Sequence, residues 1–355
     1  MFPMAAERLP GVLVAPTTTI GAAMAQLDRA GTGVLIMADE AGSLLGVVSD
    51  GDIRRAILAG APLERHCGEI ANRAPLTIGP SADAAEVLAA MDSARGSFVN
   101  SLVVVDATGT VLGLVLRRDV SDERAPLSAV IMAGGYGKRL LPLTENTPKP
   151  MLQVGDRPLL QRTIEGLHAS GIRSVAITTH HLAERITEYF GDGAGFGMDL
   201  SYVCEDAPLG TAGALRLLED SDAPLLVLNG DILSGVHYRD MLAYHRDQDA
   251  ALTVGVRRCT LEVPYGVVEN DGAMITGIRE KPRMEFFINA GVYMLEPSAR
   301  RRIPAGVRFD MTDLVAQLLA EGARVASFPI LEYWLDIGRP DDYAQAQEDV
   351  RMARL

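Results

Sequence analysis

The sequence predicts two domains: a larger α/β domain with a mostly parallel sheet over residues 127–355, and a smaller α+β domain over residues 1–122. Three observations lead to this prediction. The chain has 355 residues, which is more than one hydrophobic core usually holds. One pattern of strands and a helix occurs twice before residue 120. After residue 127, short apolar runs alternate with helical patterns, which is typical of a parallel sheet covered on both faces.

The smaller domain is predicted to be one unit used twice. The expected strands cover residues 34–37 and 44–48 in the first copy and 102–105 and 111–116 in the second. In each copy a polar turn of four residues joins the two strands, at 39–42 and at 106–109, and an amphipathic helix precedes them. Two β-β-α units with the same turn chemistry indicate an internal repeat. The polar segment 121–126 contains a proline and is expected to be a short linker.

The larger domain is predicted from buried strands that alternate with helices. Its expected strands lie at 129–132, 175–178, 225–228 and 252–256, and a helix is expected at 159–170. Each strand is a short apolar run without alternating polar residues, so both of its faces should be buried. Such strands belong in the middle of a parallel sheet with helices on either side.

Composition limits the classes of partner. The formal net charge of −13 repels phosphate polymers at long range, so we expect no nucleic-acid partner. The cysteines at 67, 204 and 259 are far apart and form no CxxC pair, which predicts neither a zinc site nor a disulfide framework. The chain has no long apolar segment at its start and no run as long as a membrane span. We therefore expect a cytoplasmic protein with no membrane partner.

The strongest local pattern is a glycine-rich loop directly after the first strand of the larger domain. The loop contains Gly134, Gly135 and Gly137, and it is followed by Arg139 and by Lys149 between two prolines. Glycines let the backbone approach a phosphate chain and point N–H groups at it. The two cations would neutralise a triphosphate. Taken alone, the loop could also be a tight turn with solvated basic residues. Pro142 argues against a helix that starts at Arg139.

These residues resemble the signature of the sugar-nucleotide pyrophosphorylases, the sugar-1-phosphate nucleotidylyltransferase family. Further blocks follow in the family's order, at residues 205–213, 229–231, 265–268, 280–282, 289–293 and 334–338. Each block is weak alone, but their common order across the larger domain is specific. The resemblance implies a Rossmann-like, GT-A-like domain that joins a sugar 1-phosphate to the α-phosphorus of an NTP and expels pyrophosphate. Such a reaction depends mainly on positioning two anions and neutralising charge.

The resemblance also implies roles for single residues. Arg139 and Lys149 would be catalytic, while Asp231 and Asp336 would bind Mg²⁺, which prefers oxygen ligands. The nucleotide would be bound by Gly134, Gly135, Gly137, Glu205, Gly210 and Thr211. The sugar phosphate would be bound by Gly266, Glu280, Lys281 and Asn289. Each residue could also have a purely structural role. A strand-end aspartate often caps a helix, and an exposed Glu-Lys pair contributes little to stability. His180 and His181 have no metal-spaced partner, and we expect them to face solvent.

The smaller domain resembles a pair of CBS motifs. The segment Ser49-Asp50-Gly51-Asp52 matches the end of such a motif, where a hydroxyl and a carboxylate bind a nucleotide. The resemblance assigns these roles to Ser49 and Asp52 and implies regulation by an adenine nucleotide. The second copy carries Leu116 at the hydroxyl position, which leaves one good site. Ser49 and Asp52 could equally be a helix N-cap with an acidic first turn.

The expected substrates are GTP and a hexose or aminohexose 1-phosphate. The segment 205–213 is more similar to mannose-1-phosphate guanylyltransferases than to thymidylyl enzymes. A CBS pair before a stand-alone transferase resembles the glucosamine-1-phosphate guanylyltransferases of bacterial legionaminic acid synthesis. Glu205 or a backbone carbonyl near Leu209 could accept hydrogen bonds from the N1–H and N2–H₂ groups of guanine. A thymidylyl- or uridylyltransferase is the alternative, and a homo-oligomer is expected.

Two other function classes are alternatives to a nucleotidylyltransferase. One is a catalytically inactive relative that senses nucleotides; the joint presence of Arg139, Lys149, Asp231, Lys281 and Asp336 argues against it. The other is a CBS-regulated dinucleotide enzyme, but the glycine spacing does not open a helix and no ribose-binding acid follows. No hexapeptide repeat follows the larger domain, so no acyltransferase activity is expected.

Overall fold

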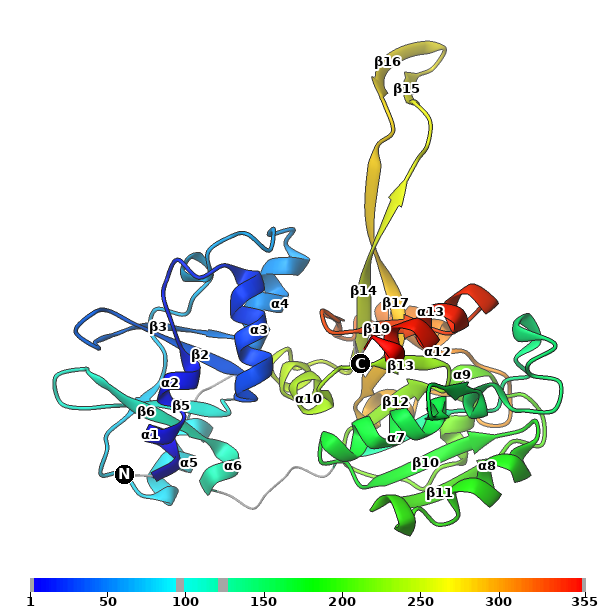
Figure 1. Ribbon diagram of the computed structural model, residues 1–355, viewed down its shortest axis with the longest axis horizontal. Coiled ribbons are helices and arrows are strands. Elements are labelled where there is room, and N and C mark those ends of the chain that lie inside the picture. The colour runs from blue at the N-terminus through cyan, green and yellow to red at the C-terminus, as the bar shows by residue number, and fades with distance from the viewer. Residues whose placement is uncertain (1–2, 94–98, 121–126, 353–355) are drawn as a thin grey trace. The chain divides into compact units, whose positions relative to one another are not determined.

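The computed structural model describes residues 3–93, 99–120 and 127–352 (Figure 1). The predicted linker at 121–126 lies outside the described residues. The chain forms two compact units. Unit 1 comprises residues 1–127 and 238–250, and unit 2 comprises residues 128–237 and 251–355. No helix among the described residues is both long enough and apolar enough to cross a membrane.

Unit 1 contains two three-stranded sheets of the same design. The first has the order β1 (Leu13–Val14), β2 (Val34–Ala38), β3 (Leu44–Ser49), and the second β4 (Thr77–Ile78), β5 (Ser101–Val105), β6 (Val111–Leu116). In both, a parallel pair is followed by an antiparallel pair whose register shifts near the turn. The predicted internal repeat is confirmed.

The helices of unit 1 bury the apolar faces of these sheets. They are α1 (Pro3–Glu7), α2 (Leu9–Val12), α3 (Ile20–Ala30), α4 (Asp50–Leu58), α5 (Ala84–Asp92), α6 (Arg117–Val120) and α10 (Tyr238–Asp247), with a 3₁₀ turn at Cys67–Glu69. The hydroxyl of Thr19 caps α3 as its position before the amphipathic run predicts. Helix α4 begins at Asp50, directly after its N-cap Ser49.

Helix α10 belongs to unit 1 although the chain on either side of it belongs to unit 2. It follows β13 (Ile232–Ser234) and precedes β14 (Leu252–Glu262). An ion pair between Arg55 of α4 and Asp247 of α10, with 2.8 Å between Nη1 and Oδ2, joins the helix to the first repeat. The sequence pattern did not predict this exchange, because the partner of a helix is decided by tertiary packing.

Unit 2 is built on a seven-stranded, mostly parallel sheet, which confirms the predicted fold class. The strand order is β11 (Asp199–Cys204), β10 (Ser174–Thr179), β7 (Ser128–Met132), β12 (Leu225–Asn229), β17 (Arg283–Leu295), β14, β18 (Val325–Pro329). Only β17 runs against its neighbours. Two small ribbons accompany this sheet, β13 with β19 (Trp334–Asp336) and β8 (Gln153–Val154) with β9 (Arg157–Pro158).

The remaining elements of unit 2 are helices and short turns. The α-helices are α7 (Leu159–Ala169), α8 (Ala183–Phe190), α9 (Gly210–Gly213), α11 (Pro297–Arg300), α12 (Met311–Ala320) and α13 (Pro340–Arg351). The 3₁₀ turns lie at Lys138–Leu140, Lys149–Met151, Ala194–Phe196 and Ala214–Leu217. One buried cluster joins Val130, Val227 and Leu252 of the sheet to Leu314 and Leu318 of α12. Such burial supplies most of the stability of these helices.

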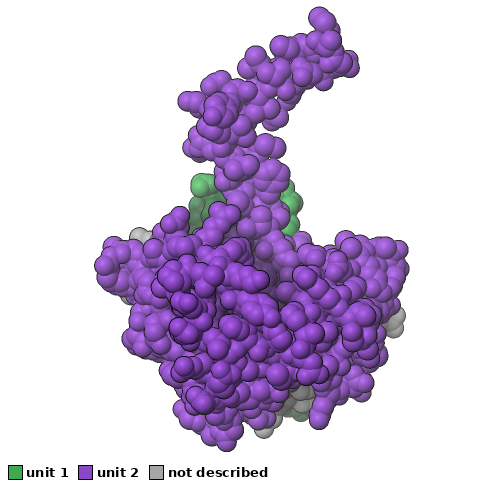
Figure 2. All heavy atoms as spheres, turned by 90° about the vertical axis from the view of Figure 1, so that its right-hand side faces the viewer, with its two compact units in different colours: residues 1–127, 238–250 green, residues 128–237, 251–355 purple. Residues whose placement is uncertain are grey.

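Strands β14 and β17 extend far beyond the other strands of the sheet. Their pairing runs from Leu252↔Leu295 to Glu262↔Arg283, and β15 (Val267–Asp271) and β16 (Met274–Arg279) form a second ribbon at the end. We call residues 257–288 the arm. The end of the arm lies away from the other strands of unit 2 (Figure 1), and the space-filling view shows a narrow projection from the body of that unit (Figure 2).

Candidate active site

Parallel strands bring several predicted residues to one edge of the sheet. Strands β10, β7 and β12 are neighbours, with Thr178 and Asn229 both paired with Met132. The glycine-rich loop, His180 and Asp231 come directly after the carboxyl ends of these strands. In open α/β sheets, ligands bind outside the carboxyl ends of the strands. This edge is therefore the candidate site.

The glycine-rich loop packs closely against residues predicted to act with it. A Cβ atom at Gly134 would lie 2.9 Å from Oε1 of Glu205, and one at Gly137 would lie 3.2 Å from Cβ of Lys149. Gly137 also has a left-handed φ of 62°, which favours glycine. Gly135 faces open space. A 3₁₀ turn, and no α-helix, begins at Lys138, as the proline at 142 predicts.

Asp231 and Asp336 lie beside each other. The antiparallel ribbon of β13 and β19 pairs Ile232 with Asp336, and the N–H of Ile337 donates to the Asp231 carbonyl at 2.9 Å. Desolvation raises the pKa of Asp336, and the charge of Asp231 raises it further. The two carboxylates therefore repel each other and favour a cation between them.

The two predicted catalytic cations converge on these carboxylates. Lys149 is buried, and its Nζ donates to Oδ2 of Asp231 at 2.5 Å. A Cβ atom at Gly338 would lie 3.5 Å from Nη1 of Arg139 and 3.6 Å from Oδ1 of Asp336. Two carboxylates and two cationic side chains from three separate sequence blocks thus lie close together. Such a cluster is suited to binding phosphates and a metal ion.

The residues present fit a divalent cation that also binds substrate. Among the described residues no group of three His, Cys, Asp or Glu side chains has metal-binding geometry. Asp231 and Asp336 would then supply two oxygens, and substrate phosphates and water would supply the rest, as is usual for Mg²⁺. Oδ1 of Asn229, two residues before Asp231, is buried without a hydrogen-bond partner. An orphaned acceptor at this place fits a site that a ligand completes.

The predicted nucleoside segment is folded tightly beside the loop. Glu205 is buried, not exposed as a strand-end carboxylate would be, and its Oε2 accepts the N–H of Leu209 at 2.8 Å. The Thr211 hydroxyl accepts the N–H of Met311 at 2.9 Å. Gly210 has a left-handed φ of 79°, and a Cβ there would lie 2.6 Å from Oδ1 of Asp310. Gly210 and Thr211 thus hold the segment in place, and their contact with a nucleotide stays a prediction.

His180 takes part in this site, although its pattern in the sequence predicts no role. One ring nitrogen of His180, Nδ1, lies 2.8 Å from the carbonyl oxygen of Glu205, and the other lies 3.0 Å from Oη of Tyr136. The ammonium of Lys138 lies 5.4 Å from the centre of the Tyr136 ring. The side chain of His180 therefore ties the nucleoside segment to the glycine-rich loop. Only the alignment of parallel strand ends could have revealed this link.

The predicted sugar-phosphate residues divide into two groups. Asn289 lies near the sheet, where its Nδ2 donates to Oη of Tyr293 at 2.7 Å and its Oδ1 accepts the N–H of Gly291 at 3.0 Å. Gly266, Glu280 and Lys281 lie on the arm and are exposed. All three are close in sequence to β15 or β16, and this ribbon lies at the end of the arm, away from β13 and β19 (Figure 1).

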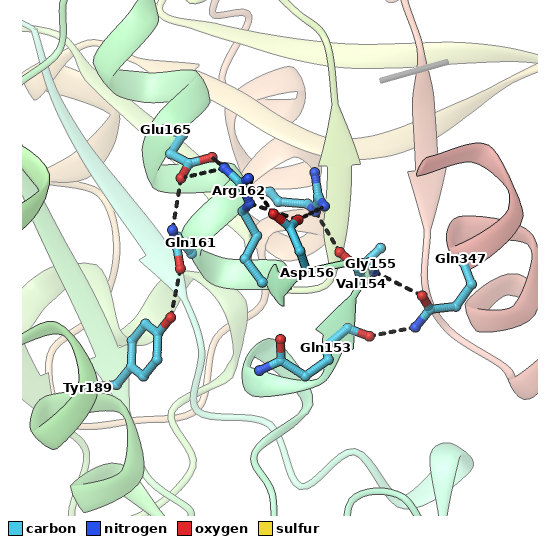
Figure 3. A network of polar contacts seen from close by, with 10 residues as sticks. Gln153, Val154, Gly155, Asp156, Gln161, Arg162, Glu165, Tyr189 and Gln347 are labelled. Atoms are coloured by element: carbon cyan, nitrogen blue, oxygen red, sulfur yellow. Dashed lines mark hydrogen bonds and ion pairs between the residues drawn. The ribbon is translucent and has the colours of Figure 1, made fainter. Parts of the chain in front are cut away.

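A network of polar contacts joins helices α13 and α7 to the turn between β8 and β9 (Figure 3). Gln347 of α13 donates to the carbonyl of Gln153 at 2.6 Å and accepts the N–H of Gly155 at 2.9 Å. Arg162 of α7 donates to a carbonyl oxygen of the same turn at 2.7 Å. Helix α13 begins four residues after Asp336, so the network anchors the helix that follows this aspartate in the chain.

In unit 1, Ser49 and Asp52 form a capping box. The backbone N–H of Asp52 donates to the Ser49 hydroxyl at 3.1 Å, and that of Ser49 donates to Oδ2 of Asp52 at 2.9 Å. Arg55 then donates to Oδ1 of Asp52 at 2.7 Å and to Asp247 at 2.8 Å. The capping role is present, and a ligand role for the pair stays a prediction.

Comparison with known proteins assigns families to both parts of the chain. The nucleotidyl transferase family model matches residues 128–352, and the CBS domain model matches residues 10–59 and 67–125. Similar curated proteins include the mannose-1-phosphate guanylyltransferase catalytic subunit beta of Danio rerio, 33% identical over 61% of this chain, and the mannose-1-phosphate guanylyltransferase of Mycobacterium tuberculosis (strain ATCC 25618 / H37Rv), 32% identical over 63%. The alignments span 62% and 64% of those relatives' lengths.

Solved structures show the same fold. A glucose-1-phosphate thymidylyltransferase described as putative, from Bacillus anthracis, aligns over 63% of this chain and 95% of its own, with a TM-score of 0.52 and 24% identity. HddC from Yersinia pseudotuberculosis, solved with GMP-PN, aligns over 63% of this chain and 99% of its own, with a TM-score of 0.50 and 25% identity. The chain therefore belongs to the nucleotidyl transferase family, as a member that also carries a CBS pair.

Proposed function

We propose that the protein transfers GMP from GTP to a sugar 1-phosphate, giving a GDP-sugar and pyrophosphate. The observation that supports this most is the meeting of Asp231, Asp336, Lys149 and Arg139 beside the glycine-rich loop. Enzymes of this family generally use a divalent metal ion. We propose Mg²⁺, since two carboxylates plus substrate phosphates suit its octahedral preference.

The chain's own groups would act by positioning and by neutralising charge. The loop N–H groups would hold the triphosphate, while Arg139 and Lys149 would face the charge that grows as pyrophosphate leaves. A bound Mg²⁺ would supply further neutralisation of the phosphates. Lys149 now balances Asp231, so a cation bound by Asp231 would free the ammonium for a phosphate oxygen. No side chain needs to form a covalent bond.

The preference for guanine rests on the nucleoside segment and on the relatives. The curated relatives named above are mannose-1-phosphate guanylyltransferases. Glu205 is buried beside Gly134, where its carboxylate could accept N–H groups of a base. A site built for one hydrogen-bonding edge rejects another because its polar groups remain unpaired. The sugar is proposed only as a hexose or aminohexose 1-phosphate, and we propose a cytoplasmic location, where nucleotides are available.

A matrix of nucleotides and sugar phosphates tests this function. GTP, ATP, UTP, dTTP and CTP are each combined with the 1-phosphates of mannose, glucose and glucosamine, and pyrophosphate release is measured with and without Mg²⁺. We expect GTP to exceed every other nucleotide by at least about tenfold in kcat/KM, equivalent to 1.4 kcal/mol. Preference for dTTP or UTP would overturn the guanylyl assignment, and no release with any pair would favour an inactive nucleotide sensor.

We further propose that an adenine nucleotide binds the first CBS repeat and changes the rate of transfer. Arg55 supports this because it bridges Asp52, at the candidate ligand site, to Asp247 of α10. Helix α10 is continuous in sequence with β13, which begins one residue after Asp231. A ligand that binds Arg55 or Asp52 would break the ion pair of Arg55 with Asp52 or with Asp247, and so would alter how α10 is held. A shift of α10 would act on Asp231 through β13, which connects them in the chain.

Calorimetry on the full chain tests the regulatory site. AMP and ADP are expected to bind the wild type with one site per chain and to change its transfer rate, and Asp52→Ala should lose that binding. The control is Asp83→Ala, which removes an equivalent capping box from α5 in the second repeat. Equal binding by both variants, or no heat and no rate change in the wild type, would contradict the proposal.

A further inference from the structure

The arm carries a preassembled group of residues that would recognise a sugar phosphate. A Cβ atom at Gly266 would lie 3.0 Å from Oε2 of Glu280, so the loop before β15 and the segment after β16 meet there. Lys281 follows with a left-handed φ of 43°, as Leu182 and Asp249 also have, which is uncommon for a residue with a side chain. Pro282 restricts the backbone of Lys281, the residue before it, and its carbonyl accepts the N–H of Val263 at 3.1 Å.

The use of lysine in this sequence singles out Lys281. The whole chain contains only three lysines, Lys138, Lys149 and Lys281, among 33 basic residues. The first two lie in the glycine-rich loop and at the carboxylates. Lysine is a compact point charge suited to phosphate, whereas arginine fills the chain's other basic positions. Lys281 therefore has the chemistry of a phosphate-binding residue, but it lies on the arm and not beside the glycine-rich loop of its own chain.

The arm exposes an unusual amount of apolar side chain. Ten of the 21 exposed large hydrophobic residues among the described part of the chain lie on it. They are Leu261, Tyr265, Val268, Met274, Ile275, Ile278, Met284, Phe286, Phe287 and Ile288. Exposed apolar side chains gathered on one segment are typical of a protein interface. Phe286 and Phe287 are consecutive in a strand, so their side chains point to opposite faces of it. Both faces of the arm therefore expose an aromatic side chain that a partner could bury.

The arm is also built to stay extended. The β14–β17 pairing continues without a register shift from Val256↔Asn289 to Glu262↔Arg283. Ion pairs between Arg258 and Glu285 and between Arg283 and Glu262 cross the same ribbon. Folding the arm back onto its own sheet would break this ladder of hydrogen bonds, and it would cover only one apolar face. A second molecule can cover both faces while the ladder stays intact.

We propose that two copies of this chain form a dimer in which each arm delivers Lys281 and Glu280 to the phosphate site of the other copy. The inference rests on the proposed transfer reaction and adds where its sugar-phosphate residues act. An isologous pair satisfies both arms and both sites at once, and leaves no arm unpaired. Each site then consists of Asp231, Asp336, Lys149 and Arg139 from one chain and the arm from its partner.

Complementation between two inactive variants tests this arrangement. Asp231→Asn damages the body of the site, and Lys281→Ala damages the arm. The two are co-expressed with different tags and the mixed dimers are purified on both tags. Each mixed dimer then holds one site with an intact body and an intact arm, so its turnover should recover to about half that of the wild type. The matched control combines Asp231→Asn with Lys149→Ala, which both damage the body, and should stay inactive.

The outcomes separate this inference from the proposed function. Mixed dimers no more active than the two parents, or a monomeric wild type in sedimentation, would overturn the exchange while leaving nucleotidyl transfer intact. A fully active Lys281→Ala homodimer would overturn the role of the arm in catalysis. Ile278→Ser with Phe286→Ser should shift the wild-type dimer to monomer, whereas Leu319→Ser, an equally exposed residue on α12, should not. Unchanged dimerisation of the arm variant would also contradict the proposal.

Discussion

Replacing Asp231 with asparagine is expected to lower kcat by about a thousandfold or more while the fold survives. Asp231 directly precedes β13 and lies beside Asp336 of β19, and its carboxylate accepts a hydrogen bond from the ammonium of Lys149. The amide keeps the size of the side chain but removes the charge that binds a cation. It also leaves the buried Lys149 without its counter-ion, so nucleotide and metal ion would both be held less well in the transition state.

Two measurements check this expectation. Steady-state kinetics over a range of Mg²⁺ concentrations give kcat, and circular dichroism with thermal melting shows whether unit 2 remains folded. Asp199→Asn, an exposed aspartate at the start of β11, is the control for the same chemical change away from the site. A turnover within tenfold of the wild type would show that Asp231 does not hold the metal ion. Rescue by higher Mg²⁺ concentration would instead identify the loss as one of metal affinity.

The fold class could be predicted because short apolar runs and turn residues act locally. The runs at 129–132, 175–178 and 225–228 lie within strands β7, β10 and β12, and the helix predicted at 159–170 is α7. The repeat of unit 1 was visible because both copies use the same turn between two strands. These features depend on neighbours in sequence, which is the information that a single sequence contains.

The centre of the site could also be predicted, because each block ends a strand. Asp231 follows β12 and the glycine-rich loop follows β7, so the parallel sheet forces them together. The ion pair of Lys149 and Asp231 could not be predicted, since it depends on the path of the chain between the two blocks. The same holds for His180, whose two ring contacts come from different loops.

Two features of the structure were beyond any pattern in the sequence. Helix α10 has an ordinary amphipathic pattern, which shows that it packs but not that it packs within unit 1. The segment 257–288 has strand-like runs separated by turn residues, which is typical of hairpins but does not predict an extended arm with apolar side chains exposed. In both cases the sequence pattern does not identify the surface against which the segment packs, because that surface is distant in sequence or lies on another molecule.

Lys149→Ala is expected to lower kcat by about a hundredfold or more with a much smaller change in KM, because its charge matters most when pyrophosphate departs. Lys149→Arg should fail nearly as badly, since the buried ammonium lies 2.5 Å from Asp231 and a planar guanidinium does not fit that contact. Lys138→Ala removes the same charge from an exposed position of the loop and should act mainly through KM. Initial rates over a range of GTP concentrations separate the two parameters. A Lys149 variant whose only defect is a raised KM would show that the lysine binds ground state and transition state alike, and the assignment of Lys149 as a catalytic residue would then be wrong.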